Sequence, residues 1–158
     1  MTLRLRPLRD DEFDDWAAEG RRWYAQDMVD HGEMEREAAE RKAEHDAAST
    51  LPQRLATPGM HVLALESVET GERVGSVWFA EREAPFEGRE AFLYSVWVDE
   101  RHRGRGFGRQ AMLLLEQEVR ALGLDRIRLN VFGGNEAARS LYRSLGYVES
   151  AVLMVKRL

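Results

Sequence analysis

The stretch VDERHRGRGFGRQ, residues 98–110, decides the fold. It ends the nearly continuous apolar segment 91–99 and leads into the broad amphipathic segment 107–122, so it predicts a buried strand, a glycine-rich turn and a helix in succession. A helix that begins at such a turn directs unpaired backbone N–H groups and the positive end of its dipole at one spot. A spot of this kind binds phosphate.

The glycines and arginines of this stretch suit that chemistry. Gly104, Gly106 and Gly108 allow a tight turn and the close approach of a ligand. Arg103 and Arg105 can donate charge-assisted hydrogen bonds to phosphate oxygens.

Three kinds of phosphate-binding turn compete for this pattern. A P-loop requires a Lys after its last glycine, and no Lys follows any glycine here. A dinucleotide-binding turn requires G-x-G-x-x-G, but Arg109 stands at the third glycine position and Asp125 precedes the next strand instead of ending it. The R-x-x-G-x-G pyrophosphate turn is matched by Arg103, Gly106 and Gly108. A nicotinamide-dependent enzyme is therefore disfavoured.

The rest of the chain supplies the other elements of an α/β fold. Strands are expected at residues 2–8, 61–66, 73–80, 91–99, 126–132 and 148–156, and helices at residues 13–31, 33–48, 107–122 and 135–145. The predicted fold class is a single mixed β-sheet flanked by helices on both faces, in the order β-αα-β-β-β-α-β-α-β. We expect one domain over residues 1–158.

Composition excludes several classes of protein. The chain has 158 residues, 44% of them hydrophobic and 32% charged, and it contains no run near the ~18 apolar residues of a membrane span. It has no cysteine, which excludes disulfides and a cysteine nucleophile. The N-terminus lacks the pattern of a signal peptide, so a cytoplasmic protein is expected. The net charge of −5 arises wholly within residues 1–60, which argues against nucleic acid as a partner.

Residues 92–147 resemble the core of the GCN5-related N-acetyltransferase (GNAT) family. The first matching stretch is LYSVWVDERHRGRGFGRQAMLLLEQEVRALG, and the second is IRLNVFGGNEAARSLYRSLGY, with its L-x-V, N-x-x-A and LY-x-x-x-G-[FY] signatures. Two signatures in the right order are far more specific than one glycine-rich turn. The resemblance implies the GNAT fold and an N-acetyltransferase (an acyltransferase) that uses acetyl-CoA and no metal. It implies direct attack of an amine on the thioester after both substrates bind.

The resemblance also implies where acetyl-CoA would bind. Its pyrophosphate would lie on the backbone amides of Arg103, Gly104, Arg105, Gly106, Phe107, Gly108 and Arg109. Its pantetheine arm would lie between two diverging strands and pair with the backbone of Val96, Trp97 and Val98. Asn130 and Asn135 would also contact the cofactor, and Asn135 is in addition a good helix N-cap.

Two residues are candidates for catalysis. By resemblance, Tyr142 would lie at the cofactor near the thioester sulfur and act as general acid, although a Tyr at this spacing can simply pack beside Leu141 and Leu145. Glu90 is expected on the same face of its strand as Phe92 and could act as a base through a water molecule. The competing interpretation is an exposed acidic residue at the end of a strand. The sequence does not identify the base.

The acceptor site is expected between the N-terminal helices and the hairpin, and its substrate-binding candidates are Trp23, Tyr24, Asp27 and Trp78. The acids there would favour a small cationic amine, whereas a solvated helix face over an aromatic core stripe is the alternative. Peptide-acetylating relatives carry a Glu at the position of Asn130, and since Asn cannot accept a proton, a protein N-acetyltransferase is a weaker alternative. A non-catalytic acyl-CoA sensor of the same fold is the other.

The remaining expectations concern partners. The partner is a small-molecule amine, with no nucleic acid and no membrane, and the sequence leaves open whether the chain forms a homodimer. The four histidines have no metal-ligand spacing, and each is expected at the surface or in a loop: His31, His45, His61 and His102.

Overall fold

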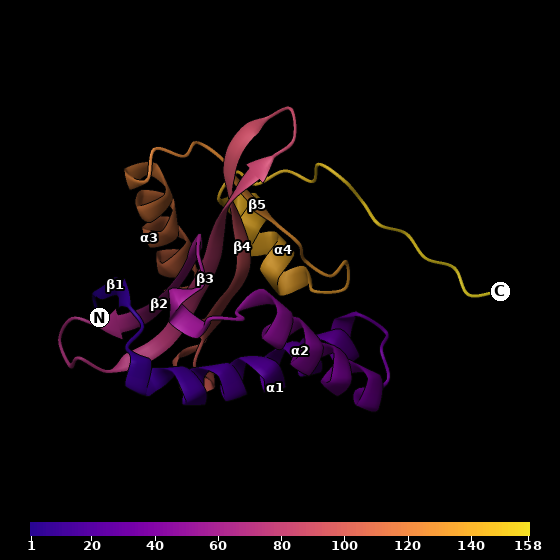
Figure 1. Cartoon of the computed structure of the whole chain (residues 1–158), viewed down its shortest axis with the longest axis horizontal. Coiled ribbons are helices and arrows are strands. Elements are labelled where there is room, and N and C mark those ends of the chain that lie inside the picture. The colour runs from indigo at the N-terminus through magenta and orange to yellow at the C-terminus, as the bar shows by residue number, and fades with distance from the viewer.

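The computed structural model describes residues 1–158 and contains one mixed five-stranded sheet (Figure 1). The strands lie in chain order across the sheet: β1 (Leu3–Pro7), β2 (Met60–Ser67), β3 (Arg73–Ala84), β4 (Gly88–Val98) and β5 (Ile127–Leu129). Neighbouring strands are antiparallel except β4 and β5, which are parallel. Because β4 and β5 are parallel, their C-terminal ends lie at the same edge of the sheet.

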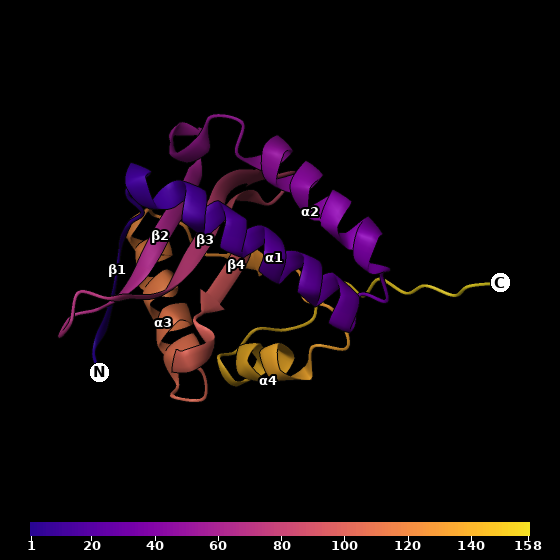
Figure 2. The same ribbon diagram turned by 90° about the horizontal axis from the view of Figure 1, so that it is seen from below.

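Helices cover both faces of the sheet. The long helices α1 (Phe13–His31) and α2 (Arg36–Thr50) lie in front of the strands in Figure 2, and α3 (Phe107–Ala121) lies behind them. The short helix α4 (Glu136–Ser144) follows β5 and packs through Leu141 and Leu145 against the same core as α3. Short 3₁₀ turns complete the connections at Asp10–Glu12, Arg54–Ala56 and Glu100–His102.

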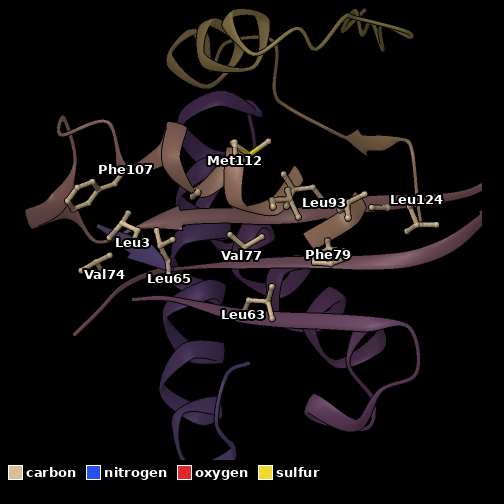
Figure 3. Packing of buried hydrophobic residues seen from close by; sticks show 14 residues of the cluster. Leu3, Leu63, Leu65, Val74, Val77, Phe79, Leu93, Phe107, Met112 and Leu124 are labelled. Carbon is tan, nitrogen blue, oxygen red and sulfur yellow. The ribbon is translucent and has the colours of Figure 1, made fainter. Parts of the chain in front are cut away.

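Two cores form because alternate strand residues point to opposite faces. Leu63 and Leu65 of β2 join the main core, which α3 covers with Met112 and Leu115 (Figure 3). Val62 and Ala64, the alternate residues of the same strand, instead pack with Phe13 and Trp16 of α1. The indole N–H of Trp16 also donates to Ser76 Oγ at 3.0 Å, which fixes α1 on β3.

Ion pairs join the start of the chain to the sheet. Glu66 of β2 is buried and binds both Arg4 and Arg6 of β1. Arg6 also donates two hydrogen bonds of 2.8 Å to Glu12 in the first 3₁₀ turn. These bonds lower the pKa of Glu12 from its ordinary value of 4.5 to about 2, because they stabilise its ionised form.

The predicted fold class is confirmed, but the last strand is not formed. Residues 148–158 lie outside any helix or strand, and Leu153 is 98% exposed. β5 is also shorter than the 126–132 expected, since it pairs with β4 over three residues only. The prediction of a strand at 148–156 is wrong for the single chain because no other strand lies beside this segment. None of the helices combines the length and apolar character needed to cross a membrane.

Candidate functional site

The turn between β4 and α3 leaves the first backbone N–H groups of α3 without partners in the helix. Gly104 and Gly106 have left-handed φ angles of 72° and 77°, and Gly106 immediately precedes the helix. No side chain caps this helix, and its first turn has no acidic residue. A Cβ on either glycine would meet no atom within 4 Å, so the space beside the turn is open. The turn therefore offers free donors, a positive helix end and room for an anion.

The arginines of the turn have different environments. Arg103 Nε donates to the Val98 carbonyl at 3.0 Å, which holds its guanidinium against the end of β4. Arg105 is exposed and forms no ion pair, so it can reach a phosphate beside the turn. Arg109 instead donates to Ser144 Oγ at 2.9 Å, so its side chain joins α3 to α4. Only the backbone amide of Arg109 was expected at the pyrophosphate, and the direction of its side chain leaves that expectation untouched.

The second half of β4 has no strand on one side. β5 pairs only with residues 91–93, whereas β4 continues to Val98 with β3 on its other side. Tyr94 has no partner on β3 and makes a β-bulge, which increases the local twist. Because an antiparallel strand shares only part of its hydrogen-bonding groups with each neighbour, some backbone groups up to Val98 face the open side. This edge can pair with an extended ligand.

The short helix α4 brings two expected residues to the site. Asn135 Oδ1 accepts a hydrogen bond from Ala138 N at 3.2 Å, which confirms Asn135 as the helix N-cap. Tyr142 is half-buried and packs against the main core. Burial, with a smaller effect of the negative charge of Asp27, raises the pKa of Tyr142 to about 12. The phenol therefore keeps its proton at neutral pH. The segment before α4 lies against the end of α1, because a Cβ on Gly134 would be 3.8 Å from the carbonyl oxygen of His31.

The C-terminal part of α1 carries an Asp–His pair. Asp27 Oδ1 lies 2.8 Å from His31 Nδ1, one turn later in the helix. The two side chains are 16% and 32% exposed, so the pair is sheltered but accessible. Sequence reasoning placed His31 among surface or loop residues and missed this pair. The i, i+4 spacing of Asp27 and His31 was the available signal.

The other residues expected to bind the acceptor line the same cleft as this pair. The Tyr24 hydroxyl donates to Asp46 Oδ2 of α2 at 3.4 Å, and burial raises the pKa of Tyr24. Trp78 stacks on Tyr94 with 4.6 Å between ring centroids, and its buried indole N–H has no hydrogen-bond partner. Trp23 is half-buried on α1. These side chains line the region with aromatic rings, and the indole N–H of Trp78 is free to donate a hydrogen bond.

One cleft of about 2870 Å³ joins these parts. It is bordered by the turn before α3, the open half of β4, and the facing sides of α1 and α4. Most of the expected site residues line it: Trp23, Tyr24, Asp27, Trp78, Val96, Trp97, Val98, Arg103, Gly104, Gly106, Phe107, Gly108, Asn130, Asn135 and Tyr142. The cleft is therefore continuous from the anion-binding turn to the Asp27–His31 pair.

Glu90 is not among the residues that line this cleft. It is 1% exposed, and its carboxylate binds Arg128 Nε at 2.8 Å and Arg82 Nη2 at 3.5 Å. The prediction of an exposed acid at the strand end is wrong, because strand register places Glu90 opposite Arg82 and close to Arg128 on β5. These ion pairs link β3, β4 and β5, and this placement argues against the catalytic role expected for Glu90.

His102 was expected at the surface or in a loop, and it lies in the connection between β4 and α3, where it is buried. It lies in the 3₁₀ turn after β4, is 8% exposed, and has its ring centroid 6.0 Å from that of Phe107. Its side chain therefore packs beside Phe107 at the start of α3 and is not exposed to solvent.

Comparison with known proteins finds relatives along the whole chain. The sequence model of the Acetyltransferase (GNAT) family matches residues 9–147. The Bacillus subtilis (strain 168) protein named N-acetyltransferase YycN is 35% identical over 159 residues, which span 100% of both chains. N-acetyltransferase YdgE of the same organism is 28% identical over 159 residues and is matched over 99% of its length.

Solved structures also resemble this chain. The crystal structure of Bacillus subtilis YycN superposes with a TM-score of 0.89 and 34% identity, over 99% of each chain. A GCN5-related N-acetyltransferase from Ralstonia eutropha JMP134 superposes with a TM-score of 0.73 over 99% of each chain. At 18% identity, the second comparison shows a shared fold only.

Proposed function

Because the chain belongs to the GNAT acetyltransferase family and is an N-acetyltransferase, we propose that it moves the acetyl group of acetyl-CoA to the primary amine of a small cationic molecule. The observation that carries the donor assignment is the open edge of β4, which ends at the uncapped start of α3. The turn suits a pyrophosphate, and the open edge suits an amide-containing arm that pairs like an added strand. Both features belong to one cleft.

The charge of the cleft supports a cationic acceptor. Within residues 13–50, the lining includes five carboxylates and only two Lys or Arg side chains: Glu19, Asp27, Glu33, Glu44 and Asp46, with Arg21 and Lys42. A wall with an excess of one charge raises the local concentration of ligands of the opposite charge. The anion-binding turn lies at the other end of the cleft, so donor and acceptor would enter regions of opposite charge.

We assign the base to His31. Its Nδ1 donates to Asp27 Oδ1, so Nε2 is left to accept a proton from the attacking amine. Asp27 fixes the ring and stabilises the imidazolium that results, as the carboxylate does in other Asp–His pairs. This assignment fills the role that Glu90 does not suit.

Tyr142 is the corresponding acid. As the amine nitrogen bonds to the acetyl carbon and the carbon–sulfur bond breaks, the Tyr142 hydroxyl gives its proton to the departing sulfur. His31 has taken one proton from the amine and Tyr142 has given one, so exchange with water restores both groups. Backbone N–H groups of β4 near residues 96–98 would stabilise the negative charge that develops on the carbonyl oxygen.

Release of free thiol from acetyl-CoA tests the proposal. The purified chain would be assayed with a diamine, an uncharged amino alcohol, glutamate and a short peptide with a free N-terminus, each at low and high salt. We expect the diamine to react fastest and its advantage to shrink at high salt, because ions screen the acidic wall. Equal or faster reaction of glutamate would contradict the acceptor class, and a preference for the peptide would favour protein acetylation.

A further inference from the structure

Residues 148–158, here called the C-terminal segment, have no partner strand within the chain. Figures 1 and 2 show the segment leaving the body near α4 and passing beyond the ends of α1 and α2. Its large apolar side chains are 71–98% exposed at Val148, Val152, Leu153, Met154 and Val155. Single exposed apolar residues are ordinary, but a continuous run of them marks a surface that another element covers.

The composition of the segment is that of a strand covered on both faces. Residues 151–155, AVLMV, are apolar at five successive positions. A strand with one face in water would alternate apolar and polar side chains instead. The segment therefore requires a neighbouring strand and a packed layer on each side of the sheet.

The outer edge of β5 is the place in this fold that meets those requirements. β5 pairs with β4 on one side and has no strand on the other. Ile127 and Leu129 of β5 pack against the main core on one face, and Phe132, just after β5, packs against α1 and α2 on the other. An added strand would therefore continue a sheet that is covered on both faces. Nearby, the Tyr147 hydroxyl is buried without a hydrogen-bond partner. An edge of this kind presents unpaired N–H and C=O groups to any suitable strand.

The chain's own segment is held away from this edge at both ends. Glu149 Oε1 accepts hydrogen bonds from Arg139 and Arg143 of α4 at 2.7 and 2.8 Å. Arg157 Nη2 donates to the Glu33 carbonyl, between α1 and α2, at 3.1 Å. Residues of the segment and of β5 line the same cleft, yet they do not pair. The segment thus stands across the cleft from the edge that it matches.

We propose that two copies of the chain exchange their C-terminal segments, so that residues 148–156 of each copy pair with β5 of the other. Each chain carries both the apolar segment and the open edge of β5. In a dimer with one two-fold axis, the segment of each copy can therefore pair with the β5 edge of the other. A partner of different sequence would cover only one of the two features. The exchanged strand also enters the cleft that contains Asp27 and Tyr142, so the partner would complete the wall of the acceptor site. That last consequence rests on the proposed function, whereas the exchange does not.

Light scattering after size-exclusion chromatography gives the first test. We expect the chain to elute at twice its mass of 18.2 kDa at micromolar concentration. Leu153→Asp places a charge in the centre of the exchanged strand and should raise the dimer dissociation constant at least 100-fold. Val68→Asp is the matched control, because Val68 is 49% exposed in the turn after β2 and should leave the dimer intact. A monomeric parent chain, or a Leu153→Asp dimer of unchanged affinity, would overturn the proposal.

Chemical cross-linking separates exchange from folding back onto the chain's own β5, and it decides the question even if Leu153→Asp fails to fold. The chain has no cysteine, so Asn130→Cys and Val152→Cys can be introduced together without interference. Asn130 follows β5 directly, and Val152 is in the apolar run. With a short bis-maleimide, exchange predicts a covalent dimer on a denaturing gel. A cross-linked monomer alone, or no cross-link in a dimeric sample, would refute it. Neither assay measures acetyl transfer, so failure of the proposed function would not affect the result.

Discussion

Replacing Gly106 with Ala should separate the ligand-binding role of the turn from its contribution to stability. Gly106 has a φ of 77°, and its added Cβ would meet no atom of the chain within 4 Å. The substitution therefore costs only the backbone strain of a left-handed non-glycine residue, about 1–2 kcal/mol. That cost lowers the melting temperature of a chain of this size by about 2–4 °C for each kcal/mol.

The effect on acetyl-CoA should be larger than this strain explains. The new methyl group projects into the open space beside the first turn of α3, where the pyrophosphate would approach the backbone amides. We expect acetyl-CoA to bind at least tenfold more weakly, which corresponds to about 1.4 kcal/mol. Isothermal titration calorimetry of acetyl-CoA with the folded variant measures this directly.

Gly123 supplies the control for this experiment. It also has a φ of 77° with no atom within 4 Å of an added Cβ, but it follows the other end of α3. The 15 residues of α3 separate the two glycines by about 22 Å. Gly123→Ala should lose similar stability and keep its affinity for acetyl-CoA. If both variants bind acetyl-CoA like the parent chain, or both lose affinity equally, the turn is not the pyrophosphate site.

Three further predictions concern side chains. Tyr142→Phe should lower kcat by roughly 10²-fold with little change in acetyl-CoA affinity, because it removes only the hydroxyl that acts as the acid. The pKa of Tyr142 is raised to about 12, so ionisation of this phenol should not reduce the activity of the parent enzyme below about pH 11. A pH–rate profile would check this. His31→Gln should likewise lower kcat by roughly 10²-fold and leave calorimetric acetyl-CoA binding intact, and normal kcat would remove His31 from the mechanism. Because the pKa of Glu12 is lowered to about 2, its ion pair with Arg6 stabilises the fold above about pH 4.5, and this stabilisation is lost as the pH falls toward 2. In Glu12→Gln, the free energy of unfolding measured in urea should therefore decline less steeply over that pH range.

The backbone shape of the proposed donor half of the site could be predicted from the sequence because it is local. The strand, the turn and the first turn of α3 are contiguous in the chain, and their glycines report the backbone shape directly. The direction of the Arg109 side chain could not be predicted in this way, since its bond to Ser144 depends on where α4 packs. A residue's place in a motif indicates its backbone position better than the direction of its side chain.

Features that depend on packing between distant elements were harder to predict. Glu90 was expected at an exposed strand end, and only the register of β3 and β4 and the position of β5 show that arginines surround it. The i, i+4 spacing of Asp27 and His31 could have indicated their pairing, but nothing nearby in sequence shows that α4 lies opposite the end of α1 and that the pair therefore lies in the cleft. The apolar run 151–155 favoured a strand that the single chain does not form, because patterning alone does not supply a neighbouring strand.

The two ends of the cleft depend on different kinds of interaction, and this has a consequence for specificity. Donor binding is proposed to rest mainly on backbone groups of β4 and of the turn, with Arg103 and Arg105 as additional phosphate contacts, so side-chain changes on the acceptor wall should disturb it little. Acceptor binding is proposed to rest on side chains of α1 and α2, such as Trp23 and Glu44, which can change without altering the strand or the turn. Substitutions on the acidic wall of α1 and α2 should therefore alter which amine reacts while acetyl-CoA affinity stays constant. A chain that kept the turn and the Asp27–His31 pair and replaced Glu44 with Lys would be expected to react more slowly with cationic amines and still bind the donor.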